Sequence, residues 1–442
     1  MASSTIRITN GTLLTSGLQH QVIKGDLYIT DRRISHIGTV PETADETIDA
    51  TGCVVMPGFI QSHIHLCQTL FRGSADDLEL LDWLKLRIWP MEASHTPESL
   101  RASAQLSIAE MIRGGTTAAL TMETVNHTEA ALQVVEETGF RAVVGKCMMD
   151  KGTEVPVGLQ EKTDASIAES IRLIEKWHGR DDGRVRMCFA PRFAVSCTDG
   201  LLREVGKLAR ERNLIIHTHA SENRDEVALV YSETGQRNIA YLDSVGLTGT
   251  HVGLAHCVWL DDTELDILAR TQTHVLHCPS SNLKLGSGVA PIVEMHERGI
   301  RVSIGADGAP CNNRLDAFTE MRLAAILQKM RKGSRHLAAA EAFRMATWEG
   351  ARAIGQEDDL GSLEVGKRAD VVIVNLNTLH AAPHPDPVSS LVYSANASDV
   401  RDTIIDGQIV MRGRELKTLS EESVLHDVQR EFESLLVRAG IA

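Results

Sequence analysis

From Pro57 onwards, the sequence alternates short apolar segments with long amphipathic ones. Pro97–Arg113 has the periodicity of a helix, and Thr116–Leu120 has the composition of a buried strand. Further strands are predicted at the segment that ends in His63–His65 and at Ala142–Val144, Val185–Phe189, Leu214–His217, Val252–Leu254, His274–His277 and Arg301–Ile304. Parallel strands joined by helices form an α/β fold, and this number of repeats predicts a (β/α)₈ TIM barrel.

The two ends of the chain have a different pattern. Short alternating segments typical of antiparallel sheets occur at Ile6–Ile8, Gly25–Ile29, Asp370–Val374 and Val400–Gly407. We therefore expect a barrel of residues 57–360 and a small β-sandwich domain formed by both chain ends, residues 1–56 and 361–442. A polar helix from about Ser420 to Ala439 is predicted at the end of the second segment.

The net charge disfavours one large class of partners. A formal charge of −14 argues against nucleic acid, because phosphate binding depends largely on Lys and Arg, so we expect a small-molecule substrate. No apolar run approaches the roughly 18 residues that a membrane span requires. The start Met1–Arg7 lacks the features of a secretory signal, so we expect the cytoplasm. The cysteines contain no C-x-x-C pair, which disfavours a zinc ribbon or a disulfide framework.

Histidines and one aspartate follow several of the predicted strands. His63 and His65 lie two residues apart, so both imidazoles share one face of a strand. His217 and His219, His256 and Asp307 end three other strands. In a (β/α)₈ barrel these ends meet at one mouth, where active sites of this fold are built. The pattern predicts a metal site at the mouth, although spacing alone does not choose between His217 and His219.

Six motifs of the chain resemble those of the amidohydrolase superfamily. They are Pro57–Ile60 leading to His63–His65, Thr69–Gly73, His219–Glu222, Ala255–Cys257, His277–Leu285 and Gly305–Gly308. Within the superfamily the chain is similar to the branch that contains guanine deaminases, S-adenosylhomocysteine and 5′-deoxyadenosine deaminases, and s-triazine hydrolases.

The resemblance implies a mononuclear metal site. Its ligands would be His63, His65, His219 and Asp307, with His219 preferred to His217 because Glu222 follows it as in the family. Three imidazoles and a carboxylate suit zinc, or else iron, and leave a position for a water molecule of lowered pKa. The motif for a carboxylated lysine between two metals is not apparent, so we expect one divalent ion per subunit.

The same resemblance implies hydrolytic deamination of an aromatic N-heterocycle. Asp307 would take the proton of the attacking water, Glu222 would protonate a ring nitrogen, and His256 would hydrogen-bond the water or the tetrahedral centre. The motifs favour these catalytic roles over two structural alternatives. Glu222 could be an acidic residue at the start of a helix, and Asp307 could be a turn residue.

The substrate motifs point in two directions. Arg192, in Ala190–Phe193, resembles a guanine deaminase arginine that faces the base, whereas Glu92, in Ile88–Glu92, resembles the ribose-binding glutamate of 5′-deoxyadenosine and S-adenosylhomocysteine deaminases. Gln68, Trp89 and His256 are further candidates for substrate binding. Each residue also has a structural alternative to substrate binding. Arg192 could form a salt bridge at the barrel rim, and Glu92 could lie at a solvated helix end.

The hypothesis we prefer is removal of the 6-amino group from adenosine-type nucleosides such as 5′-deoxyadenosine, methylthioadenosine and S-adenosylhomocysteine. Guanine deamination is the alternative, and s-triazine amino- or chlorohydrolysis is the third hypothesis. The non-enzymatic hypothesis is a barrel that has lost catalysis and acts as a scaffold. A homo-oligomer is a family expectation.

Overall fold

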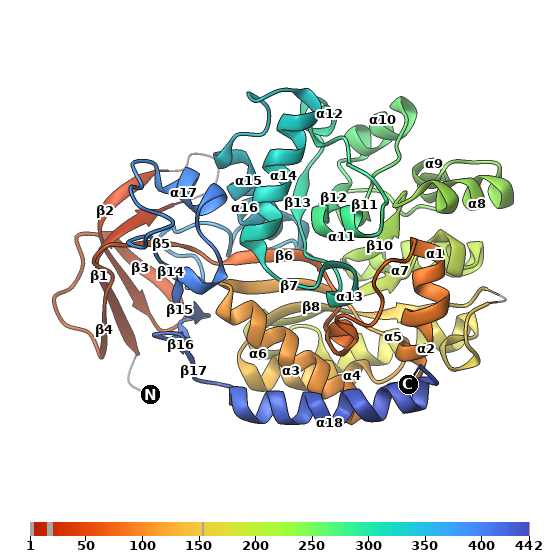
Figure 1. Ribbon diagram of the computed structural model, residues 1–442, viewed down its shortest axis with the longest axis horizontal. Helices are drawn as coiled ribbons and strands as arrows, with labels where there is room; N and C mark the ends of the chain where they lie inside the picture. Colours follow the sequence, from red (N-terminus) through yellow and green to blue (C-terminus); the bar gives the residue numbers. More distant parts are fainter. Residues whose placement is uncertain (1–3, 16–20, 153, 442) are drawn as a thin grey trace.

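The computed structural model describes residues 4–15, 21–152 and 154–441, and eight parallel strands form one sheet at its centre (Figure 1). These strands are β6 (Phe59–Ile64), β7 (Thr116–Met122), β8 (Arg141–Met148), β9 (Val185–Pro191), β10 (Ile216–Ala220), β11 (Val252–His256), β12 (His274–His277) and β13 (Val302–Ile304). A parallel bridge joins Ile64 to Asp307, and the Ser62 hydroxyl donates to the Ile304 carbonyl at 2.9 Å. The last strand therefore returns to the first, and the predicted (β/α)₈ barrel is confirmed.

Helices surround this sheet on the outside (Figure 1). They are α3 (Pro97–Arg113), α4 (Thr128–Thr138), α5 (Thr163–Trp177), α6 (Arg180–Gly183), α7 (Asp199–Arg212), α8 (Arg224–Thr234), α9 (Asn238–Ser244), α10 (Asp262–Thr271), α11 (Pro279–Lys284), α12 (Ile292–Glu297), α13 (Ala309–Asn312), α14 (Ala317–Lys332), α15 (Ala339–Ala346), α16 (Trp348–Ala353) and α17 (Pro387–Tyr393). Short 3₁₀ turns lie at η3 (Val157–Leu159), η4 (Ala194–Ser196) and η5 (Ala397–Asp399). Helix α3 has the predicted bounds because Thr96 caps its start, where the hydroxyl accepts from the Ser99 amide.

One strand differs from its predicted position. We expected a strand at Leu214–His217, whereas β10 begins at Ile216 and extends to Ala220. Asn213 ends helix α7 in the left-handed region (φ +53°), and the Leu214 amide donates to the Ala209 carbonyl. Leu214 therefore belongs to the helix end, and the strand carries His219 as well as His217.

The second sheet is built by both ends of the chain. Its strands are β1 (Thr5–Leu14), β2 (Val22–Thr30), β3 (Arg33–Gly38), β4 (Glu46–Asp49), β5 (Cys53–Pro57), β14 (Val371–Asn375), β15 (Val400–Ile405), β16 (Gln408–Arg412) and β17 (Glu415–Leu416). Strand β5 pairs antiparallel with β14, so the tail completes the N-terminal sheet. A buried ion pair between Arg141 of β8 and Asp370 (2.9 Å) connects this sheet to the barrel.

A helical segment after β6 covers the mouth of the barrel. It consists of the 3₁₀ helix η1 (Leu66–Phe71), α1 (Leu80–Trp83), the π-helical turn η2 (Leu84–Ile88) and α2 (Trp89–Ala93). The terminal helix α18 (Glu421–Ala439) lies along α3 and reaches α2 (Figure 1).

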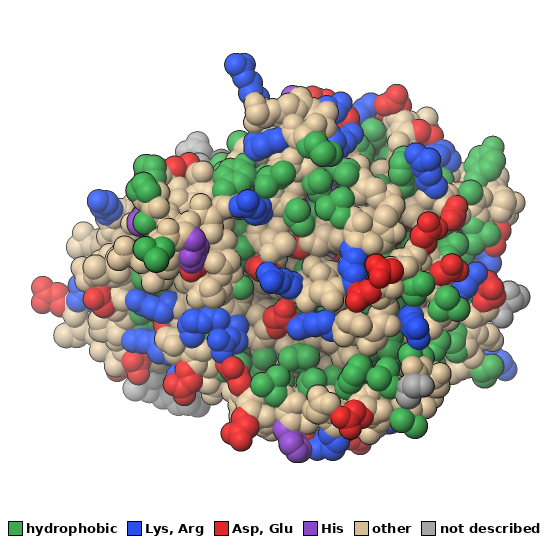
Figure 2. Space-filling model, viewed as in Figure 1, with side chains coloured by type: hydrophobic (Ala, Val, Ile, Leu, Met, Phe, Trp, Pro, Cys, Tyr) green, Lys and Arg blue, Asp and Glu red, His purple; other side chains and the backbone are tan. Residues whose placement is uncertain are grey.

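On the face drawn in Figure 2, acidic and basic side chains are interspersed. Within the described residues, no helix has the length and apolarity to cross a membrane. Met1–Ser3, at the start of the segment expected to lack a secretory signal, lie outside the described residues.

Candidate active site

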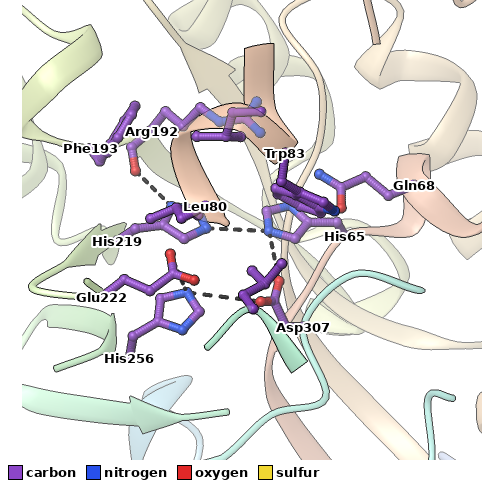
Figure 3. A pocket seen from close by; sticks show the side chains of 12 residues that line it. His65, Gln68, Leu80, Trp83, Arg192, Phe193, His219, Glu222, His256 and Asp307 are labelled. Carbon is purple, nitrogen blue, oxygen red and sulfur yellow. Dashed lines mark hydrogen bonds and ion pairs between the residues drawn. The ribbon is translucent and has the colours of Figure 1, made fainter. Parts of the chain in front are cut away.

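The predicted metal ligands converge at the mouth of the barrel, where Figure 3 shows three of them. His63 lies near the end of β6 and His65 directly follows this strand, His219 lies on β10, and Asp307 follows β13. Asp307 Oδ1 is 3.3 Å from His63 Nε2 and 3.2 Å from His65 Nε2. His65 Nε2 is in turn 3.3 Å from His219 Nε2. Nitrogen and carboxylate atoms this close together can bind one ion.

The second nitrogen of each ring is held by a neighbour. His65 Nδ1 donates to the Met122 carbonyl and His219 Nδ1 to the Arg192 carbonyl, both at 2.7 Å. His63 Nδ1 lies 2.6 Å from His217 Nε2. Partners of this kind fix the ring orientation and leave Nε2 free for a metal. His63 Nε2 is buried and has no hydrogen-bond partner among the described residues, as expected for a nitrogen that ligates an ion.

The backbone around Asp307 is shaped to bring its side chain to the histidines. Asp307 adopts a left-handed conformation (φ +64°), which non-glycine residues adopt mainly where surrounding contacts enforce it. Gly305, two residues earlier, allows β13 to approach β6, because a Cβ atom there would lie 2.6 Å from the His63 backbone. The Ser281 hydroxyl donates to Asp307 Oδ2 at 2.6 Å.

The charges of Asp307, His63 and His219 favour metal binding, whereas that of His65 responds to Asp307. Although burial acts in the opposite direction, His63 and His65 hold the pKa of Asp307 well below its usual range, so the carboxylate is ionised. Burial lowers the pKa of His63 to about 4 and that of His219 well below its ordinary value. For His65, the Asp307 carboxylate outweighs the effect of burial and raises the pKa. Neutral imidazoles and an ionised carboxylate are the forms that ligate metals.

Glu222 and His256 lie beside this cluster and face each other (Figure 3). Glu222 Oε2 is 3.5 Å from His256 Nε2, which is 3.9 Å from Asp307 Oδ2. Burial, with Asp307 nearby, raises the pKa of Glu222 well above its ordinary value. His256 is held by a hydrogen bond of 2.9 Å between Nδ1 and Asn282 Oδ1, and burial lowers its pKa. His63, His256 and Asp307 also form a compact group, so His256 borders the metal position directly.

A cavity opens from these residues towards the helical segment over the mouth. It is lined by His65, Gln68, Leu80, Trp83, Leu84, Arg192, Phe193, His219, Glu222, His256, Leu285 and Asp307. The lining therefore combines polar groups with apolar and aromatic side chains. This composition is common in sites that bind small molecules.

Behind the cavity, Glu92 and Arg192 form a buried ion pair. Arg192 Nη1 donates to Glu92 Oε2 at 2.6 Å, and Gln68 Nε2 donates to Glu92 Oε1 at 2.8 Å. Glu92 is only 1% exposed, so the structural alternative of a solvated helix end is wrong for this residue. Arg192 thus forms a salt bridge, which was the structural alternative for this residue, and substrate binding by either residue stays a prediction.

Comparisons with known proteins agree with this geometry. The model of the amidohydrolase family matches residues 54–410. The chain belongs to the amidohydrolase family.

Two curated relatives are similar over nearly the whole length of this amidohydrolase. A 5′-deoxyadenosine deaminase of Methanothermobacter thermautotrophicus is 41% identical, over 96% of this chain and 97% of the relative. A 5-methylthioadenosine/S-adenosylhomocysteine deaminase of Desulforudis audaxviator is 40% identical, over 93% and 95%. Among solved structures, an adenosine deaminase from Xanthomonas campestris with bound zinc has a TM-score of 0.92 and 32% identity, covering 98% of this chain and 99% of that one.

Two predicted substrate residues of the amidohydrolase, Glu92 and Trp89, do not line this cavity. Trp89 does not line the cavity beside the metal ligands but a neighbouring one, with Leu81 and Lys85. The cavity at the metal ligands is lined instead by Leu80 and Trp83, with Leu84. Residues three and four apart share a helix face, so these two sets face opposite sides of the same helical segment.

Several residues of the site were not predicted from the sequence. Leu80, Trp83, Phe193 and Leu285 line the cavity, but in sequence they are indistinguishable from core residues. Ser281 lies within a family motif, yet its contact with Asp307 could not be read from spacing. His277, from the same motif, has no hydrogen-bond partner for either ring nitrogen among the described residues.

Proposed function

We propose that this amidohydrolase is a metal-dependent deaminase that removes the 6-amino group of adenosine-type nucleosides. The expected substrates are 5′-deoxyadenosine, methylthioadenosine and S-adenosylhomocysteine, which the curated relatives' names also suggest. The observation that carries the proposal is the buried, high-pKa carboxyl of Glu222, next to His256 and the ligand cluster. We further expect a cytoplasmic homo-oligomer.

The donor set fits one divalent ion. The ligands we propose are His63, His65, His219 and Asp307. Ligand atoms of the three histidines lie close enough together to hold an ion, and Asp307 Oδ1 lies 3.2–3.3 Å from His65 and His63 Nε2. Zinc is the ion we favour, with iron as the alternative, because both accept imidazole and carboxylate ligands. Such an ion supplies Lewis acidity and a bound water whose pKa lies near neutrality.

The side chains around this position supply the proton transfers. Asp307, ionised at neutral pH, accepts the proton of the attacking water. Glu222 keeps its own proton because its pKa is raised, and donates it to the ring nitrogen beside the amine-bearing carbon. His256 holds the water or the tetrahedral centre by a hydrogen bond. As the C–N bond breaks, Glu222 takes the proton of the new C–OH group and passes it to the amine, which leaves as ammonia. The ring keeps the oxygen of the water as a carbonyl, and the proton held by Asp307 returns to Glu222.

Glu92 is the residue we propose for binding ribose. Hydrogen bonds from Arg192 and Gln68 hold its carboxylate in place. A carboxylate offers about four lone-pair positions, and these contacts use three of them. The remaining position is the one we propose for a ribose hydroxyl. Because Glu92 does not line the cavity in this structure, substrate binding has to rearrange Gln68 or Arg192, which both line it.

Guanine deamination is the second candidate, because Arg192 lines the cavity whereas Glu92 does not. A guanidinium group at this place could donate to a purine carbonyl.

The s-triazine hypothesis requires the same metal and water, but Glu222 favours an amine leaving group over chloride, which departs without a proton. The scaffold hypothesis predicts a purified chain with well below one metal ion per subunit.

A substrate panel tests the proposal. Ammonia release is measured with guanine, adenosine, 5′-deoxyadenosine, methylthioadenosine, S-adenosylhomocysteine and melamine. We expect the highest kcat/KM with one of the adenosine-type nucleosides. Turnover of guanine alone, or of melamine alone, would contradict the proposed substrate class while leaving the metal site intact.

The Glu92→Gln variant is expected to raise KM for 5′-deoxyadenosine about 10- to 100-fold, because a hydrogen bond to a charged group contributes about 1.5–3 kcal/mol. Steady-state kinetics of the zinc-loaded enzyme measure this effect. Asp82→Asn is the matched control, since Asp82 is exposed on the same helical segment. An unchanged KM in the Glu92 variant would remove this residue from substrate binding.

A further inference from the structure

Helix α18 lies beyond residue 410, where the match to the family model ends. Its inner face carries an apolar stripe at helical spacing, Val424, Val428, Phe432 and Leu435. In Figure 1 the helix, drawn in blue, lies along α3, and its C-terminal end reaches α2. The last helix of the chain therefore contacts the segment over the barrel mouth.

The C-terminal half of α18 packs into the apolar cluster that forms the wall of the cavity. Leu435 is fully buried in this cluster (0% exposed), and Phe432 packs against it. Trp83 of α1 and both Trp89 and Met91 of α2 belong to the same cluster. The position of α2 therefore depends on side chains more than 300 residues away in sequence.

Hydrogen bonds and charges fix both ends of α18. Arg438 Nε donates to the Ser94 carbonyl at 2.9 Å, and Ser94 directly follows α2, two positions after Glu92. At the other end, Glu421 pairs with Arg113 of α3. Helix α2 has only five residues, and so short a helix is not stable without tertiary contacts.

We infer that α18 positions the substrate side of the active site. It holds α2 in place, and through α2 it keeps the Glu92 carboxylate against Gln68 and Arg192. Helix η1, which carries Gln68, also contacts α18, so both partners of the Gln68–Glu92 hydrogen bond depend on it. The metal ligands are held by barrel strands instead. The effect on catalysis rests on the proposed function, in which Glu92 binds ribose.

The Arg438→Gln variant tests the inference without opening a core cavity. We expect faster hydrogen exchange in the peptide that spans residues 89–95, and a KM for 5′-deoxyadenosine raised about tenfold, because small displacements of positioning groups have effects of this order or larger. The values of kcat and metal content should stay unchanged. Arg430→Gln is the matched control, since within the described part of the chain Arg430 forms ion pairs only with Asp427 and Glu431 on the same helix.

A second pair of variants addresses the apolar contact. Leu435→Ala should show the same changes more strongly, and Leu425→Ala, at a site 61% exposed on the same helix, should show none. Exchange that is unchanged in both Arg438→Gln and Leu435→Ala would overturn the inference, and so would a parallel loss of kcat, metal and stability. Faster exchange with an unchanged KM would support the role of α18 and contradict ribose binding by Glu92.

Discussion

Glu222→Gln is expected to lower kcat about 10²- to 10⁴-fold with no loss of metal, because it removes the proton donor but leaves the ligands in place. The buried carboxyl has a raised pKa and is 3.5 Å from His256, so the amide keeps the shape of the site without its proton. Single-turnover ammonia release and metal analysis of the same sample measure both quantities.

Asp225→Asn is the control for this variant, since Asp225 is an exposed carboxylate three residues further along the chain. It should retain full activity. Full activity in Glu222→Gln, with metal bound, would show that another group transfers the proton. It would contradict the role of Glu222 on which the proposed function depends.

His219→Ala is expected to lose stoichiometric metal and nearly all activity, because it removes a proposed ligand. His217→Gln provides the contrast on the same strand. His217 touches His63 Nδ1 at 2.6 Å, and the loss of such a partner weakens metal affinity about 10- to 100-fold without abolishing binding. Activity of His217→Gln should therefore return in excess zinc, whereas that of His219→Ala should not.

Metal titration followed by fluorescence of a competing chelator measures the two affinities. The opposite pattern, with tight zinc binding in His219→Ala and none in His217→Gln, would identify His217 as the ligand. The role of Glu222 would be unaffected, so the two predictions can fail independently.

The convergence of the four proposed ligands could be predicted because each lies at or just after the end of an apolar strand. His63 and His65 share a strand face at a separation of two, and β13 delivers Asp307 to the same mouth. The preference for His219 over His217 came from the family motif. In the structure His65 Nε2 lies 3.2 Å from Asp307 Oδ1 and 3.3 Å from His219 Nε2. The start of β10 was misplaced because its first apolar residue, Leu214, packs as the end of α7.

The substrate side could be predicted only in part. The ion pair between Glu92 and Arg192 joins residues 100 positions apart, and no local periodicity indicates such a contact. The family motif predicts that Trp89 binds the substrate, because the motif includes this residue. In the structure Trp83 lines the cavity at the metal ligands, and Trp89 lines a neighbouring cavity. The terminal helix was predicted, but its contact with α2 depends on tertiary packing that the sequence pattern does not encode.

The central claim is that His63, His65, His219 and Asp307 bind one metal ion in the active enzyme. Crystals of active protein, measured on both sides of the metal absorption edge, test it most directly. We predict a single anomalous peak about 2.0–2.2 Å from the three Nε2 atoms and the carboxylate. A map of fully active crystals with no peak among these side chains would contradict the account.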